Sequence, residues 1–286
     1  MPIEWIVVSG HDKILLSIVS MSTILCYGSI CADLHIWLPR WPTLGSGVHA
    51  LHSRWMAGGN ALNEARALVR WGVQPLLYGD RLGYDLPGDL VAATLQQLGL
   101  DAHVERDATV TTPVCHILIT PDGERTIIAL RQGTAASPPS SQALAASQIV
   151  SVSRYGLHTT EVALAARRHE RLVVAGDVGK PDEPLAQAAD VIVTSAALLG
   201  SEPRERAVLL QQVRGAIVFV TDGARPARVL VNGTWYEETP PVQSVSNSTG
   251  AGDIFRAAVV YGLWQGWEVS AILAFAAHAA AEQIAV

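Results

Sequence analysis

Lysine is scarce in this 286-residue chain, and its scarcity excludes two kinds of nucleotide site. Of the 20 lysine and arginine residues, only Lys13 and Lys180 are lysine. Neither stands in the G-x-x-x-x-G-K-[ST] pattern of a phosphate-binding P-loop, because Pro181 follows Lys180. The V-A-I-K sequence of protein kinases is absent as well. The chain therefore uses neither of these lysine-dependent ways of holding phosphates.

Charge is also sparse. Charged residues make up 16% of the chain, below the roughly 25% of typical soluble proteins. Hydrophobic residues make up 49%, which excludes intrinsic disorder because enough apolar surface can be buried. The formal net charge of −6 argues against a nucleic-acid partner, since nucleic-acid binders present a basic surface. We expect a folded cytoplasmic protein.

Cysteine is limited to Cys26, Cys31 and Cys115. No C-x-x-C pair is present, so a zinc ribbon or a thioredoxin-type site is unsupported. The spacing of Cys26 and Cys31 puts them on opposite faces of one expected strand. We expect buried free thiols in a reducing cytoplasm.

A nearly uncharged stretch over residues 14–31 is long enough to suggest a membrane segment or a signal peptide. Several serines dilute it, and no clear small-residue cleavage site follows. Its second half, 24–30, instead indicates a buried strand, and Met21 stands just before that strand. We expect residues 1–20 to lie outside the fold as an extension from an upstream start codon. We expect no membrane partner.

Apolar runs bounded by turn residues alternate with segments of helical spacing along the rest of the chain. The expected strands are 23–31, 75–78, 114–120, 149–152, 172–175, 191–194 and 217–221. The expected helices are 61–71, 85–98, 160–169, 205–213, 253–264 and 269–284. Continuous hydrophobic strands between helices predict an α/β fold, with a mainly parallel sheet covered on both faces.

Two segments break this alternation. Residues 35–55 are rich in Trp, Pro and Gly, and residues 101–130 read as successive strands with a Pro-Asp-Gly turn. Together they predict a small β lid over one edge of the main domain. Segments 21–34, 56–100 and 131–286 then form the α/β nucleotide- and substrate-binding domain.

The strongest chemical signal is the sequence Ser-Thr-Gly-Ala-Gly-Asp at 248–253, followed at once by an apolar helix. A glycine-rich turn that opens a helix points backbone N–H groups outward at the positive end of the helix dipole, which forms an anion site. Asp253 in that turn either caps the helix or acts as a general base beside a phosphate. The hexapeptide alone leaves both interpretations open.

Two weaker signals precede it. Gly58 and Gly59 let the backbone approach a ligand closely, and Asn63 offers a donor and an acceptor one turn into the following helix. Taken alone, this segment is more typical of a plain helix start with Asn63 on the surface. Asp33 directly follows the first expected strand, where ligands bind in open α/β sheets, although a turn-forming Asp is the simpler interpretation.

These signals, in this order, resemble the ribokinase-like carbohydrate kinases of the PfkB type. The amino-terminal signature of that family resembles Gly58–Gly72, and its carboxyl-terminal signature resembles Ser248–Ala258. Further landmarks match Gly28-x-x-x-x-Asp33 and the segments 79–85 and 121–125. The resemblance runs from about residue 23 to the carboxyl end. It implies a ribokinase-like three-layer α/β/α sandwich with a mainly parallel central sheet and a small β lid.

The resemblance implies a kinase that transfers the γ-phosphoryl group of ATP to a hydroxyl of a small sugar or sugar-acid acceptor. Asp253 would be the catalytic base. The helix-start residues that would form the anion hole are Gly250, Ala251 and Gly252. The residues that would hold the acceptor are Asp33, Gly58, Gly59 and Asn63.

The same resemblance assigns the nucleotide side and the lid. Thr221 and Gly223 match a Thr-x-Gly sequence of the family, and His278 stands where an Asn near the adenine is common. The lid would close and exclude water, which otherwise competes as phosphoryl acceptor. Arg131 stands where sugar-acid and fructose kinases of the family contact substrate. It is either a ligand for an acceptor carboxylate or an exposed arginine at a strand end.

The chain also departs from the family pattern. Ser195 and Leu198 replace the usual Asn and Glu that organise Mg²⁺ through water, so no direct metal ligand is expected. Such losses typically lower metal affinity or activity about 10–100-fold. Asn247 replaces the usual Asp, which weakens any monovalent-cation site.

Three functions therefore stay open: an active small-molecule kinase, a catalytically impaired homologue that binds nucleotide or sugar, and a nucleoside kinase or unrelated α/β protein. A homodimer through the β lid is a further option, suggested by Trp37, Trp41 and Trp55. The same tryptophans can instead pack over the substrate site.

Overall fold

The computed structural model describes residues 23–130, 134–241 and 249–284. The expected extension over residues 1–20 therefore lies outside the described residues, and so do Arg131 and Asn247. Within the described residues, strands and helices alternate along most of the chain, as the hydrophobic pattern predicts. No helix of these segments is both long and apolar enough to cross a membrane.

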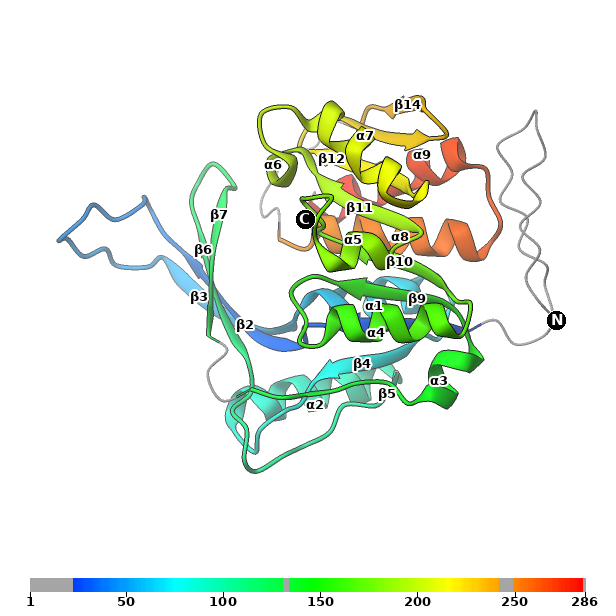
Figure 1. Ribbon diagram of the computed structural model, residues 1–286. Helices are drawn as coiled ribbons and strands as arrows, with labels where there is room; N and C mark the ends of the chain where they lie inside the picture. The colour runs from blue at the N-terminus through cyan, green and yellow to red at the C-terminus, as the bar shows by residue number, and fades with distance from the viewer. Residues whose placement is uncertain (1–22, 131–133, 242–248, 285–286) are drawn as a thin grey trace.

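A large, mostly parallel sheet forms the centre of the molecule (Figure 1). Its strands in spatial order are β14 (Thr234–Glu238), β13 (Arg225–Val231), β12 (Ile217–Asp222), β11 (Val191–Ser195), β10 (Leu172–Gly176), β9 (Ser147–Ser153), β1 (Thr23–Gly28), β4 (Leu76–Asp80) and β5 (Asp101–Ala102), with β8 (Ala136–Ser137) beside β4. Pairing is parallel from β12 to β5 and antiparallel at β8, β13 and β14. The predicted mainly parallel sheet is confirmed.

Helices cover both faces of this sheet. One face carries α1 (Asn60–Arg70), α2 (Leu86–Leu98), α8 (Ala251–Trp264) and α9 (Val269–Ile284). The other carries α3 (Ser141–Ala146), α4 (Thr159–Arg168), α5 (Pro184–Ala188), α6 (Ala196–Leu199) and α7 (Pro203–Arg214). Successive strand residues feed the two cores in turn, with Ile24 in the first and Leu25 in the second. Three layers result, as expected.

The expected single strand over residues 23–31 is wrong, because the chain changes sheets within it. β1 ends at Gly28, and a new strand, β2 (Cys31–Trp37), begins in a second sheet. At the crossing the backbone N–H of Ile30 donates to Oδ2 of the buried Asp80 at 3.0 Å. A side chain therefore satisfies a backbone group that has no strand neighbour at this point.

This break corrects two expectations. Asp33 does not follow the first strand in a turn, because it lies inside β2 of the second sheet. Cys26 and Cys31 do not lie on opposite faces of one strand, because Cys26 is in β1 and Cys31 is in β2. Both of these thiols are buried and unbridged, and Cys115 is half-buried and unbridged.

The second sheet stands beside the sandwich (Figure 1). Its strand order is β3 (His52–Gly58), β2, β6 (Val114–Ile119) and β7 (Arg125–Leu130). β2 and β6 pair in parallel, whereas β3 and β7 pair antiparallel at the two edges. Short connections join this sheet to the sandwich at two places. The end of β1 leads into β2, and the end of β3 leads into the beginning of α1.

A buried ion pair ties α1 to α8. Nε of Arg256 donates to Oε2 of Glu64 at 2.9 Å, and the two side chains are 2% and 1% exposed. The guanidinium lies against Gly176 at the end of β10, where any side chain would overlap it. Burial raises the pKa of Glu64, although the neighbouring arginine charge opposes this rise. Because both side chains are buried, water cannot solvate either charge if its partner is removed.

We predict that Glu64→Gln lowers the free energy of unfolding by about 3–5 kcal/mol, because it leaves the Arg256 charge buried without its closest partner. Urea denaturation followed by circular dichroism measures this change. The matched control is Arg225→Gln, since Arg225 pairs with Asp222 while its own side chain is 76% exposed. We expect the control to leave the free energy of unfolding close to that of wild type, because solvent screens an exposed ion pair. Equal losses in both variants would contradict the structural role of the buried pair.

Candidate active site

A cavity of ≈ 100 Å³ lies between strands β2 and β3 of the second sheet and helices α1 and α8. Its polar and charged lining residues are Asp33, His35, Asn63, Arg66, Arg70, Thr249 and Gln283. Gly250 and Ile254, at the beginning of α8, also line it. The structure therefore brings the two glycine-rich segments of the sequence and Asp33 to one place.

The start of α8 is an open, glycine-rich turn. Gly250 has φ 82°, a left-handed conformation that favours glycine, and the helix begins at Ala251. A Cβ at Gly252 would meet no atom within 4 Å, and one at Gly250 would meet only Nδ2 of Asn63 at 3.8 Å. The N–H groups at this helix start have no partner within the helix, so the turn has both room and donors for a phosphate.

Asp253 lies in the first turn of α8 and is held by α1. Nδ2 of Asn63 donates to Oδ2 of Asp253 at 2.8 Å. Nη2 of Arg256 lies 3.6 Å from Oδ1 of the same carboxylate, whose side chain is 18% exposed. The amide of Asn63 thus orients one oxygen of Asp253, and the carboxylate remains accessible beside the glycine-rich turn.

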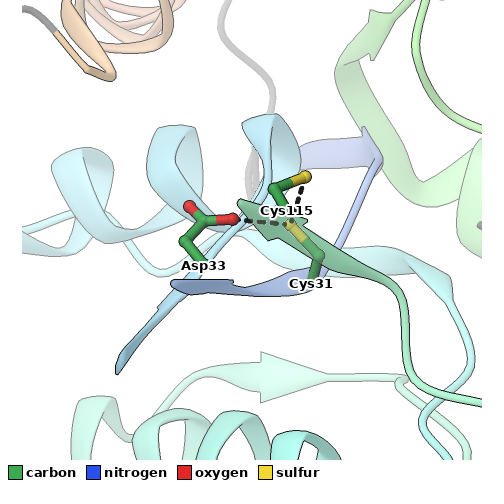
Figure 2. A group of neighbouring side chains, drawn as sticks. All are labelled: Cys31, Asp33 and Cys115. Carbon is green, nitrogen blue, oxygen red and sulfur yellow. Dashed lines mark hydrogen bonds between the residues drawn. The ribbon is translucent and has the colours of Figure 1, made fainter. Parts of the chain in front are cut away.

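Asp33 forms the opposite wall. Its carboxylate packs over Gly58 of β3, where any side chain would overlap Oδ2. Its Oδ1 accepts a hydrogen bond from Sγ of Cys31 at 3.1 Å (Figure 2). The pKa of Asp33 is raised to about 6, mainly by burial and also by the charge of Asp253, while the hydrogen bond from Cys31 and the charge of Arg66 oppose the rise. A carboxylate with few protein donors in a cavity is suited to binding hydroxyl groups of a ligand.

Gly59 sets the beginning of α1. It has φ 94°, and a side chain at this position would overlap the carbonyl oxygen of Ser29. The close approach holds the amino-terminal end of α1 against the crossing between β1 and β2. Gly59 therefore positions Asn63 through the backbone, whereas its own atoms are not part of the cavity lining.

The residues expected on the nucleotide side lie outside this cavity. Thr221 ends β12 and donates its hydroxyl to the carbonyl oxygen of Thr194 at 3.3 Å, and Gly223 follows in the turn to β13. His278 lies on α9, with Nδ1 donating to the carbonyl oxygen of Ala274 at 2.8 Å. β10, β11 and β12 run parallel, so their carboxyl-terminal ends lie on the same side of the sheet. Thr221, near the end of β12, therefore lies on the same side as Gly176 at the end of β10, which contacts Arg256.

Arg66 in the cavity lining and Asp177 beside Arg256 were not among the residues expected from the sequence. Arg66 lines the cavity and donates to the carbonyl oxygen of Ala57 at 2.8 Å and to Oδ1 of Asn63 at 3.4 Å. Arg66 is three residues after Asn63 on the same helix, so the sequence could have placed both side chains on one face. Asp177 follows β10 with φ 64°, and its Oδ2 lies 3.6 Å from Nη1 of Arg256. Burial raises the pKa of Asp177, and the arginine charge lowers it.

The two departures from the family pattern, Ser195 and Leu198, are neighbours at the end of β11. The Ser195 hydroxyl accepts a hydrogen bond from the Leu198 N–H at 3.3 Å and caps α6. Leu198 is 37% exposed and offers no oxygen ligand. Two other carboxylates, those of Asp253 in the first turn of α8 and Asp177 after β10, face Arg256.

Comparisons with known proteins identify the family of this chain. Residues 21–286 match the sequence profile of a pfkB family carbohydrate kinase. The ribokinase of Arabidopsis thaliana is 26% identical over 88% of this chain and 73% of its own length. The ketohexokinase of Mus musculus is 25% identical over 91% of this chain and 95% of its own length.

The structure of Arabidopsis thaliana ribokinase complexed with ribose and ATP is similar to this one at a TM-score of 0.78 and 22% identity. The similarity covers 93% of this chain and 94% of that chain. The ribokinase-like α/β fold implied by the sequence is therefore confirmed.

The raised pKa of Asp33 predicts a pH dependence of stability. Between the ordinary aspartate value of 3.8 and about 6, the folded protein keeps a proton on Asp33 that the unfolded chain loses. The stability that this proton contributes is thus present at low pH and is lost as the pH rises through this window. We expect the difference in unfolding free energy between wild type and Asp33→Asn to change by up to about 3 kcal/mol, since one pKa unit corresponds to about 1.4 kcal/mol.

Urea denaturation at pH values from 4 to 7 measures this difference. The control is Asp182→Asn, because Asp182 is exposed and outside the cavity. A constant difference between wild type and Asp33→Asn across the window would contradict the raised pKa.

Proposed function

Because the chain belongs to the pfkB family of carbohydrate kinases, we propose that it transfers the γ-phosphoryl group of ATP to a hydroxyl of a small sugar or sugar acid. The observation that carries the proposal is the hydrogen bond of 2.8 Å between Asn63 and Asp253. It joins the wall of the cavity to the glycine-rich turn. An acceptor in the cavity and a phosphate at the turn would then meet at one carboxylate.

In the proposed reaction, Asp253 accepts the proton of the acceptor hydroxyl as its oxygen attacks the γ-phosphorus. The bond from that phosphorus to the oxygen of ADP breaks, and ADP leaves. The N–H groups of Gly250, Ala251 and Gly252 donate to the phosphoryl oxygens, on which the transferring charge is spread. Asp33 and Asn63 hold other hydroxyls of the acceptor, so that the attacking oxygen is aligned.

The nucleotide side of the proposal uses Thr221, Gly223 and His278 beside the same sheet edge. Mg²⁺, bound mainly through the phosphates, would supply charge neutralisation during the transfer. Oxygen ligands suit this ion, and Asp177 and Asp253 are the carboxylates near the turn that would hold it through water. Leu198 contributes nothing to it, so we expect weak metal affinity rather than loss of the reaction.

The second sheet, made of β3, β2, β6 and β7, is proposed to act as the lid. The lid segments expected from the sequence, 35–55 and 101–130, contribute most of it, whereas Asp101–Ala102 lie in the central sheet as β5. Asp33 and Gly58 lie in this sheet and Asn63 and Asp253 lie in the sandwich. Closing the lid would therefore complete the acceptor site and exclude water from the phosphoryl group.

The acceptor class follows from the cavity. The cavity must widen to hold a monosaccharide. Arg66 and Arg70 add positive charge to its lining. We therefore include sugar acids among the acceptors to be tested, beside the pentoses and ketohexoses suggested by the names of the similar proteins. Nucleosides test the nucleoside-kinase alternative.

We predict that Asp253→Asn lowers the rate of acceptor-dependent ADP release by at least about 100-fold, because the acceptor proton loses its base. Nucleotide binding, measured by calorimetry, is expected to stay within a few-fold of wild type. ADP release from Mg·ATP is followed over a panel of pentoses, ketohexoses, sugar acids and nucleosides. The control variant is Glu205→Gln, which is exposed on α7.

Each outcome of the panel distinguishes the candidate functions. Wild-type turnover in Asp253→Asn would show that the base is assigned wrongly. If wild type binds ATP but releases no ADP with any acceptor, the protein is a nucleotide-binding homologue. The loss of the usual carboxylate at Leu198 would then be the reason, and this observation is what supports that second candidate.

A homodimer through the lid is part of the proposal. Every residue of β7 is exposed, although β7 carries Ile127, Ile128 and Leu130 with exposures of 51%, 47% and 50%. Trp41 and Trp55 are also exposed, whereas Trp37 stacks on His52 with ring centroids 4.2 Å apart. An edge strand with apolar side chains is a surface that proteins normally cover.

We predict that the chain is dimeric and that Ile127→Asp shifts it to the monomer, because a charge would be buried in the shared surface. Size-exclusion chromatography with light scattering measures the mass. Leu209→Asp on α7, with Leu209 49% exposed, serves as the control and is expected to leave the mass unchanged. A monomeric wild type, or a dimer that survives Ile127→Asp, would refute association through the lid.

A further inference from the structure

Cys31, Asp33 and Cys115 form a side-chain cluster at the wall of the cavity (Figure 2). Cys31 and Asp33 are two residues apart on β2, so their side chains share one face. Cys115 lies on β6 directly opposite Asp33 in the parallel register. The fold therefore brings Cys115 of β6 beside Cys31 and Asp33 of β2, from which it is remote in sequence.

The distances within the cluster are those of a small coordination sphere. The two sulfurs lie 3.8 Å apart, and Sγ of Cys31 lies 3.1 Å from Oδ1 of Asp33. One ligand atom from each residue falls within 4.8 Å of the others. A tetrahedral zinc ion with Zn–S bonds of about 2.3 Å would separate two thiolates by about 3.8 Å and a thiolate from a carboxylate oxygen by about 3.5 Å. The two distances, 3.8 Å between the sulfurs and 3.1 Å between Sγ of Cys31 and Oδ1 of Asp33, therefore lie within a few tenths of an ångström of this geometry.

The chemistry of the ligands selects the ion. Two thiolates and one carboxylate suit zinc and related soft divalent ions, whereas Mg²⁺ and Ca²⁺ prefer oxygen ligands alone. Cys31 is 2% exposed and Asp33 is 6% exposed, so water competes little for the ligands. Arg66, which lines the same cavity, offsets part of the negative charge that three ionised ligands would carry with the ion.

We propose that Cys31, Asp33 and Cys115 bind one zinc ion, with the fourth coordination position facing the acceptor cavity. Binding releases the protons of the two thiols, and the two thiolates and the carboxylate replace water molecules that the hydrated ion gives up. Since Asp33 then coordinates the ion, it no longer holds acceptor hydroxyls. Zinc and acceptor therefore exclude each other, a consequence that rests on the proposed function, whereas ion binding itself does not.

Cobalt(II) titration of the full-length chain tests the site directly, because cobalt replaces zinc and reports its ligands by absorption. The protein is first reduced with a phosphine. A separate sample is unfolded and alkylated, and its mass confirms that all three cysteines are reduced. We expect one equivalent of cobalt to produce a sulfur-to-cobalt charge-transfer band and the visible bands of tetrahedral cobalt. Zinc is expected to remove these bands by displacing cobalt.

The three cysteines supply matched variants. Cys31→Ala and Cys115→Ala should each lower the affinity for zinc by at least about 100-fold, beyond the 10–100-fold effect typical of losing a residue that only orients a ligand. Cys26→Ala is the control, because Cys26 is buried in β1 in the main core. Circular dichroism checks folding, and the half-buried Cys115 keeps the test valid if Cys31→Ala does not fold.

The proposal is overturned if reduced wild type gives no charge-transfer band, if Cys115→Ala binds cobalt like wild type, or if Cys26→Ala loses binding equally. In the ADP-release assay, zinc is expected to raise the acceptor KM and leave kcat unchanged, with Cys115→Ala resistant. Inhibition that acceptor does not relieve would overturn the exclusion at Asp33. A protein without kinase activity would still give the cobalt result, so the two proposals fail separately.

Discussion

The candidate site depends on the contact between α1 and α8, the two helices that begin with glycine-rich turns. The buried pair of Glu64 and Arg256 fixes their spacing, and one turn away Asn63 donates to Asp253. A buried charge is tolerated only with its partner in place, so the two helices cannot slide past each other without a large loss of stability. The geometry of the candidate site and the stability of the core therefore rest on the same helix pair.

The second constraint is the passage of the chain from β1 into β2. Because the strand leaves the main sheet after Gly28, Asp33 belongs to the second sheet while the base candidate belongs to the sandwich. Movement of one sheet against the other would alter the distance between acceptor ligand and base. The same passage aligns β2 with β6 and so brings Cys31 and Cys115 together.

The hydrophobic pattern predicted several elements closely, because their stability comes from local periodicity. α9 has the predicted bounds, and α1 differs by one residue at each end. The hairpin of β13 and β14 was missed, although its Asn232-Gly233 turn, with φ 48° and 80°, is a typical hairpin signal. The break within residues 23–31 was not predictable, because its stabilising partner, Asp80, is supplied by β4.

The sequence by itself determined the fold class and nominated the candidate site residues carried by local motifs, because a glycine-rich helix start or an amphipathic helix needs only neighbouring residues. Tertiary structure alone decided which remote side chains meet: Glu64 with Arg256, Asn63 with Asp253, and Cys31 with Cys115. These pairs depend on sheet register and on helix packing. Neither sheet register nor helix packing can be predicted from the spacing of these residues along the chain.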